Sequence, residues 1–166
     1  MNAPTGDVPD FLRIIRTLTD HGVEFIVVGG VAANLFGSAR LTYDLDIVYS
    51  RKEANLRQIA KALENANPYL RGAPLGLPFK LDLRTLKNGL NFTLTTDLGP
   101  IDLLGEVPGA RSYEELLNDS IEINEQDLTF RCVTLPRLIQ LKNAAGRPKD
   151  LESLAELRAI LEDLDK

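Results

Sequence analysis

Two acidic residues, Asp44 and Asp46, stand two positions apart in a segment whose alternation predicts a β-strand. Side chains at alternate positions leave the same face of a strand, so the two carboxylates would lie side by side. Neighbouring carboxylates repel and raise each other's pKa. Mg²⁺ relieves that repulsion, because it takes hard oxygen ligands and joins carboxylates to substrate phosphates. A solvated strand edge with two surface acids is the alternative, and it would suffice for an isolated Asp-x-Asp pair.

A third acid, Asp102, interrupts the apolar segment 101–105. A carboxylate in a short apolar strand is unfavourable to bury unless it is paired or bound to a metal ion. If this strand lies beside the strand of Asp44 and Asp46, three carboxylates converge. Three acids can hold two metal ions roughly 3.5–4 Å apart, which suits an in-line displacement. The alternative is an outward-facing residue on an edge strand.

Two glycines, Gly29 and Gly30, separate an expected buried strand at 24–28 from an expected short helix at 31–36. Glycine lets the backbone approach a ligand closely, and the unpaired N–H groups at the start of a helix favour phosphate. Tight packing at a strand-to-helix turn is the alternative explanation.

A basic cluster follows near the C-terminal end of the sequence. Lys142, Arg147 and Lys149 surround an expected junction between two helices, and Asp150 stands where the second helix would begin. The ammonium of Lys142 could help to hold a triphosphate. The alternative is a set of ordinary solvated charges, with Asp150 acting as the N-cap of the last helix.

Taken together, these residues resemble the signature of the DNA polymerase β superfamily of nucleotidyltransferases. Val28-Gly29-Gly30 is followed after thirteen residues by Asp44-Leu45-Asp46. Residues 37–46 look like the Gly-x-x-Arg-x-Thr-x-Asp-x-Asp form of small bacterial members, and Asp102 falls where such proteins carry a third carboxylate. The segment 142–150 is similar to the C-terminal motifs of type IV toxin–antitoxin nucleotidyltransferase toxins and their relatives. The resemblance covers about 24–160, with a loose middle at about 66–90.

The resemblance implies transfer of a nucleoside monophosphate from an NTP to a hydroxyl acceptor. Asp44 and Asp46 would bind Mg²⁺, or Mn²⁺ in its place. Asp102 would bind the catalytic metal and help to deprotonate the acceptor hydroxyl. The hydroxyl oxygen would attack the α-phosphorus, and pyrophosphate would leave.

The resemblance also implies contacts to the NTP. Gly29, Gly30 and Asn34 would lie along the phosphates, Lys142 would contact the triphosphate, and Asp150 would orient that lysine.

Two further residues have alternative roles in the same pattern. Arg40 and Thr42 would either brace the strand that carries the acid pair or reach toward phosphate. Gly30 departs from the serine of many relatives, so one hydroxyl contact to phosphate is absent, although the residue fits a Gly-Gly branch of the family.

The periodicity of apolar residues and the turn residues predict an α/β (α+β) fold with a small mixed β-sheet, flanking helices and a C-terminal helical pair. Helices are expected at 10–21, 31–36, 53–67, 82–87 and 113–117, from 134, and from about 150. Strands are expected at 24–28, 44–49, 91–96, 101–105, 121–125 and 129–133. Residues 68–78 are expected to form a loop, and Ser50 to Glu53 a capping box.

The 166 residues fit a nucleotidyltransferase core at 1–133 and a helical segment at 134–166, packed as one compact unit. The hydrophobic content of 44% is enough for a packed core. With a single cysteine, Cys132, no internal disulfide can form, and the residue is expected to be a small buried hydrophobe. This suits a reducing compartment such as the cytoplasm.

The formal charge of −5 argues against a general nucleic-acid coat. No apolar run is long enough for a membrane span, and no secretion signal is visible. The acceptor is left open between RNA such as tRNA, a protein and a small molecule. A toxin with a cognate antitoxin is one form of this function. The alternative is a non-catalytic nucleotide-binding or toxin–antitoxin interaction module with the same fold.

Overall fold

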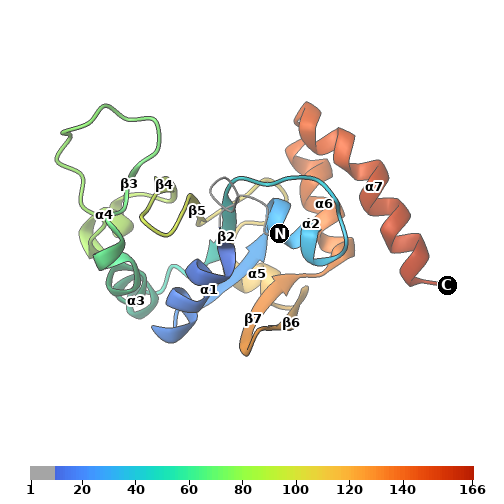
Figure 1. Ribbon diagram of the computed structural model, residues 1–166, viewed down its shortest axis with the longest axis horizontal. Coiled ribbons are helices and arrows are strands. Elements are labelled where there is room, and N and C mark those ends of the chain that lie inside the picture. Colours follow the sequence, from blue (N-terminus) through green and yellow to red (C-terminus); the bar gives the residue numbers. More distant parts are fainter. Residues whose placement is uncertain (1–9) are drawn as a thin grey trace, which may run out of the picture.

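A computed structural model describes residues 10–166 and builds them around one mixed sheet (Figure 1). Seven strands of this part of the chain pair in the order β3-β4-β5-β2-β1-β7-β6. They are β1 (Phe25–Val28), β2 (Leu45–Tyr49), β3 (Tyr69–Leu70), β4 (Asn91–Thr95), β5 (Ile101–Leu104), β6 (Ser120–Glu125) and β7 (Leu128–Val133). The predicted α/β class with a mixed sheet is confirmed.

The centre of the sheet consists of β1, β2 and β5. All four residues of β1 are buried, as its apolar run predicts for a strand covered on both faces. The β2 strand pairs antiparallel with β1 and parallel with β5. In this register Asp46 lies opposite Val28 on one side and Asp102 on the other, so the pairing itself brings two acids together.

Helices flank the sheet and extend beyond it at both ends of the molecule (Figure 1). They are α1 (Phe11–Asp20), α2 (Gly29–Leu35), α3 (Glu53–Leu63) with the 3₁₀ turn η2 (Glu64–Ala66), α4 (Leu83–Asn88), α5 (Tyr113–Leu117), α6 (Leu135–Ala145) and α7 (Pro148–Leu164). In Figure 1, α3 and α4 lie at one end, while α6 and α7 pack together at the other and form the predicted helical pair. The α6 helix also contacts α2, next to the two glycines.

The segment expected to be a loop at 68–78 contains the short strand β3, which corrects the prediction. Tyr69 pairs with Thr95 and Leu70 with Leu94, antiparallel to β4. A strand of two residues is too short to show an alternating pattern. It exists because the neighbouring strand supplies its hydrogen-bond partners.

The predicted capping box at the start of α3 does not form. The helix begins at Glu53, and its N-cap, Lys52, makes no side-chain cap hydrogen bond. The hydroxyl of Ser50 instead accepts from the backbone N–H of Lys52 at 3.3 Å. The buried side chain of Asn55 holds this end of the helix. It accepts from Glu24 N at 2.7 Å and donates to the carbonyls of Glu24 and Ser50 at 3.0 and 2.8 Å.

The last helix begins at Pro148, two positions before the expected start near Asp150. Proline fits the first turn of a helix because its missing N–H would have no partner there. Asp150 is therefore the third residue of the helix and not its N-cap. Its side chain accepts from the backbone N–H of Arg147, so it still satisfies a free donor at the helix start.

Cys132 is fully buried in β7, as expected. Burial raises the pKa of its thiol to about 12, so the residue stays protonated and serves as a small apolar side chain. No helix within residues 10–166 combines the length and the apolar character that crossing a membrane would require.

Candidate active site

Three carboxylates converge at one end of the central strands. Asp44 immediately precedes β2, Asp46 is the second residue of that strand, and Asp102 is the second residue of β5. One oxygen from each of the three lies within 4.8 Å of the other two. The convergence predicted from the sequence depends on β5 pairing parallel to β2, and this pairing is present.

The pKa values of Asp46 and Asp102 are raised, mainly by burial. Burial, followed by the charges of Asp44 and Asp102, raises the pKa of Asp46 to about 8, although Lys149 opposes the shift. Burial also raises the pKa of Asp102, with Asp44 adding to the shift, while hydrogen bonding to Asp46 and the nearby Arg71 act against it. In the metal-free protein the cluster therefore holds a proton more readily than isolated aspartates would.

Two oxygens in the cluster are suited to a further ligand. Asp46 Oδ1 and Asp102 Oδ1 are buried, and neither accepts a hydrogen bond from any residue between 10 and 166. Buried polar atoms are normally satisfied, so such atoms call for a partner. Their chemistry is that of hard oxygen donors, which fits Mg²⁺ or a similar divalent cation.

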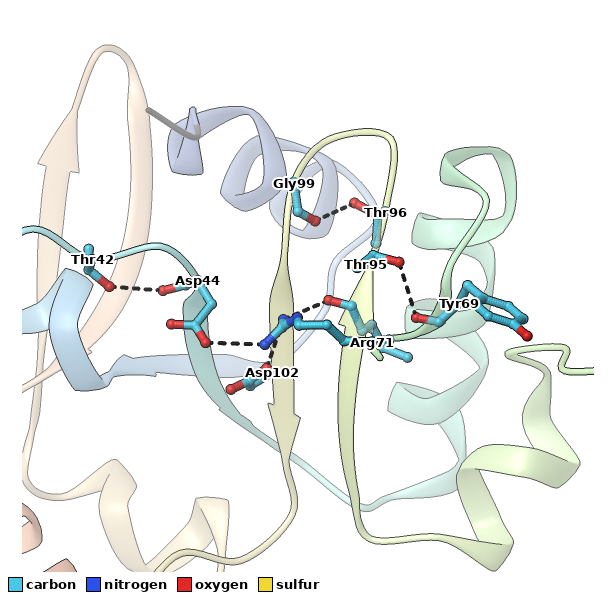
Figure 2. A network of polar contacts seen from close by, with 9 residues as sticks. Thr42, Asp44, Tyr69, Arg71, Thr95, Thr96, Gly99 and Asp102 are labelled. Atoms are coloured by element: carbon cyan, nitrogen blue, oxygen red, sulfur yellow. Dashed lines mark hydrogen bonds and ion pairs between the residues drawn. The ribbon is translucent and has the colours of Figure 1, made fainter. Parts of the chain in front are cut away.

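Arg71 is a member of the cluster that the sequence did not reveal. Its Nη1 donates to Asp44 Oδ2 at 3.2 Å, and its Nη2 lies 3.0 Å from Asp102 Oδ1 and donates to Leu94 O at 2.7 Å. Figure 2 shows the guanidinium between the two acids, reached from the β3–β4 side of the sheet. The residue belongs to the glycine- and proline-rich segment expected to be a loop. Only the short pairing of β3 with β4 brings it to the site.

The two glycines open α2 and allow close approach from two other side chains. The helix begins at Gly29, two residues earlier than expected, with a φ of +66°. A Cβ at Gly29 would collide with the carboxylate of Asp46, and one at Gly30 would lie 2.6 Å from Thr42 Oγ1. Tight packing, the structural alternative, therefore accounts for both glycines. Both also line the cavity beside the acids.

The segment between the glycines and the acid pair is held by short polar contacts. Asn34 Nδ2 donates to the carbonyls of Ser38 and Arg40 at 3.1 and 2.8 Å, and Asn34 is not among the residues that line the cavity. Thr42 Oγ1 donates to the carbonyl of Asp44 at 3.2 Å, which is the contact expected of a bracing residue. Arg40 lines the cavity.

The basic cluster forms around the junction of α6 and α7, where Gly146 ends α6 with a φ of +63°. At its centre is Asp150, with only 2% of its side chain exposed. Arg147 Nε donates to Asp150 Oδ2 at 2.7 Å, and Lys142 Nζ lies 3.8 Å from Asp150 Oδ1. Burial of Asp150 would raise its pKa, but its contacts with Arg147 and Lys142 hold the pKa below the usual range. Burial lowers the pKa of Lys142, and Asp150 opposes this shift.

A cavity of about 430 Å³ joins the two clusters. This volume is within the range of small-molecule sites. The cavity wall includes nine of the ten residues to which the resemblance assigns a site role, and Asn34 is the exception: Gly29, Gly30, Arg40, Thr42, Asp44, Asp46, Asp102, Lys142 and Asp150. Arg147 and Lys149 also line it. One wall is thus acidic and comes from the sheet, whereas the other is basic and comes from α6 and α7.

Comparison with solved structures supports the fold. No protein-family model and no curated protein sequence matches the chain. The structure of TM1012 from Thermotoga maritima, assigned as a nucleotidyltransferase, is similar with a TM-score of 0.57 and 15% identity over 93% of this chain and 97% of that one. The lincosamide antibiotic adenylyltransferase LnuA in its lincomycin-bound form is similar with a TM-score of 0.60 and 14% identity over 93% and 99%. The chain therefore shares the fold of these two nucleotidyltransferase structures and carries a cluster of three aspartates.

Proposed function

We propose that the protein is a metal-dependent nucleotidyltransferase that moves a nucleoside monophosphate from an NTP to an acceptor hydroxyl. One observation carries the proposal: the oxygens of Asp44, Asp46 and Asp102 lie within 4.8 Å of one another on the wall of a cavity whose facing wall is basic. An acidic wall suits a divalent cation, and a basic wall suits a triphosphate. The similarity to nucleotidyltransferases, with almost the full length of each chain covered, supports the same function.

Asp44, Asp46 and Asp102 would hold the metal ion. The two buried carboxylate oxygens that accept no hydrogen bond among residues 10–166, Asp46 Oδ1 and Asp102 Oδ1, support this assignment, although the second forms an ion pair with Arg71. When bound, Mg²⁺ or Mn²⁺ would supply positive charge where negative charge develops on the transferring phosphoryl group.

Residues that line the cavity would bind and position the NTP. Lys142, with Arg147 and Lys149 beside it, would bind the triphosphate. Asp150 would keep Lys142 in place, and its contacts with Lys142 and Arg147 support that role. The backbone at the two glycines would lie along the phosphates. These groups fix the α-phosphorus opposite the acceptor, which is the larger part of catalysis in phosphoryl transfer.

The chemical step is an in-line displacement. The acceptor hydroxyl oxygen attacks the α-phosphorus while its proton passes toward Asp102. The bond between the α-phosphorus and the oxygen bridging to the β-phosphate breaks, and pyrophosphate leaves. Asn34 and Arg40 would act at a distance from this step, Asn34 by shaping the turn before the acid pair and Arg40 by adding positive charge to the cavity.

The C-terminal segment 134–166 would act as one unit with the core 1–133, since the basic wall belongs to the former and the acidic wall to the latter. We place the reaction in the cytoplasm, in line with the buried, unpaired Cys132. Acceptors to be tested are a small molecule, RNA such as tRNA, and a protein. LnuA, which is an antibiotic adenylyltransferase, makes a small molecule the first to try. A toxin role with a cognate antitoxin is a narrower form of the proposal.

The test is transfer of label from each of four α-labelled NTPs in the presence of Mg²⁺. Reactions contain a panel of small hydroxyl compounds that includes lincosamides, bulk tRNA, or total cell extract. The Asp44→Ala, Asp46→Ala double variant is the inactive control, and Asp163→Ala, at a side chain 80% exposed, controls for loss of an acid. Label moved by the wild type and Asp163→Ala, but not by the double variant, supports the proposal. If no label moves and the wild type binds neither Mg²⁺ nor NTP, the proposal is wrong, and an interaction module becomes the better reading.

A further inference from the structure

Arg71 is the one cation in contact with the acidic cluster among residues 10–166. Its guanidinium bridges Asp44 Oδ2 at 3.2 Å and Asp102 Oδ1 at 3.0 Å. The second of these oxygens is one of the two buried atoms suited to a metal ion. Arg71 and a divalent cation would therefore use the same carboxylates.

The backbone of Arg71 is anchored to the sheet, whereas its side chain can leave the acids. Its N–H donates to Thr93 O at 3.0 Å, which anchors the residue beside β4. The guanidinium reaches the acids from that side (Figure 2). Arg71 is not among the residues that line the cavity. Its side chain is 29% exposed, and its buried Nε has no acceptor within residues 10–166. Solvent can reach the contact, and a side chain that left the acids could find a water partner for its Nε in exchange for the contacts it loses.

The positive charge of Arg71 affects how the three acids bind a divalent cation. Three neighbouring carboxylates repel one another, and a guanidinium beside two of them removes part of that repulsion. A divalent cation brought to the same acids meets a fixed positive charge a few ångströms away, which opposes binding. It also has to replace the hydrogen bond and the ion pair that Arg71 already makes.

We propose that Arg71 is an internal cation that competes with the divalent metal ion for Asp44 and Asp102, an inference that rests on the proposed function. In the metal-free state it keeps the two acids paired. When the metal ion binds, Arg71 gives up its contact with at least one of them. Arg71 thereby sets how tightly the site binds the ion alone.

The experiment compares Mg²⁺ binding to the wild type and to the Arg71→Gln variant by isothermal titration calorimetry, without nucleotide. Measurement at pH 8.5 keeps protons from masking the effect. We expect Arg71→Gln to bind Mg²⁺ at least tenfold more tightly. Arg57→Gln is the matched control: it removes the same charge, and within residues 10–166 Arg57 pairs only with Glu53 on α3. Its affinity is expected to stay within twofold of the wild type.

A conservative variant keeps the test decisive if Arg71→Gln folds poorly. Arg71→Lys retains the charge but cannot bridge both acids and Leu94 O at once. Its Mg²⁺ affinity is expected to lie between those of the wild type and Arg71→Gln. Thermal unfolding provides a second readout, since Mg²⁺ should raise the melting temperature of Arg71→Gln more than that of the wild type.

The outcomes separate the two proposals. If the wild type binds Mg²⁺ and both Arg71 variants bind it equally or more weakly, Arg71 supports the metal site and does not compete for it, so the inference is wrong while the proposed function stands. If the wild type and both variants all fail to bind Mg²⁺ with and without NTP, the metal site itself is wrong, and both proposals fall.

Discussion

Replacing Asp46 by asparagine should stabilise the metal-free protein, although Asp46 is central to the proposed reaction. Burial and the charges of Asp44 and Asp102 raise the pKa of Asp46 from 3.8 to about 8. The unfolded chain releases this proton near the lower value, and the folded chain keeps it until about pH 8. Between these limits the folded state binds more protons than the unfolded state, so stability falls as the pH rises.

The size of the effect follows from the pKa shift. Each pKa unit corresponds to about 1.4 kcal/mol, so a shift of about four units sets an upper limit of roughly 5 kcal/mol at pH 8. Relaxation of the site and entry of water reduce this, and we expect a gain of about 1–3 kcal/mol for Asp46→Asn. The gain should grow from pH 5 to pH 8, because asparagine cannot ionise, and then level off, because above about pH 8 Asp46 is ionised in the folded and the unfolded state alike.

Urea unfolding in the presence of EDTA at pH 5, 6.5 and 8 measures this difference, with Asp163→Asn as the exposed control. Added Mg²⁺ should stabilise the wild type and leave Asp46→Asn nearly unchanged. A variant less stable than the wild type at pH 8, or a stability difference that does not change with pH, would refute the electrostatic account of the cluster.

Three further predictions follow from the same contacts. Gly29→Ala should abolish tight Mg²⁺ binding in a calorimetric titration and destabilise the fold by about 1–3 kcal/mol. The reason is that residue 29 has a φ of +66° and that the added Cβ would collide with Asp46. Mg²⁺ binding equal to that of the wild type would contradict this. Asn55→Ala should lower the free energy of unfolding by about 2–4 kcal/mol in urea, since it removes the side chain that partners the backbone N–H of Glu24 and the carbonyl of Ser50; a loss below about 0.5 kcal/mol would be inconsistent with that role. Mg²⁺ affinity of the wild type should rise between pH 6 and 8 by up to about tenfold per unit and then level off, as Asp46 loses its proton; a flat calorimetric profile would count against it.

Much of the site could be predicted because local sequence features mark its residues. Asp44 and Asp46 share one strand face, and Asp102 stands out as an acid in an apolar run. The sequence alone does not determine whether β5 pairs with β2, since strand order is a property of the whole sheet. The resemblance to a known family provided the reason to expect that pairing.

The parts that could not be predicted depend on contacts between distant segments. Arg71 reaches the acids only through a two-residue strand, and no periodicity marks so short an element. Ser50 and Glu53 have the spacing of a capping box, yet it is the side chain of Asn55 that ties this helix end to Ser50 and to Glu24, the residue before β1. In both cases a contact outside the local pattern decides the outcome.

Each of the two charged clusters beside the cavity contacts one residue of opposite charge. Arg71 lies among the acids of the sheet, and Asp150 lies among the basic residues of α6 and α7. Asp150 is buried, with 2% of its side chain exposed, and accepts a short hydrogen bond, so it should stay in place when a triphosphate binds. Arg71 is 29% exposed and lacks an acceptor for its Nε among residues 10–166, so it can be displaced. In the proposed reaction the basic wall is therefore prepared before substrate arrives, whereas the acidic wall would become ready only as Arg71 gives way to the metal ion.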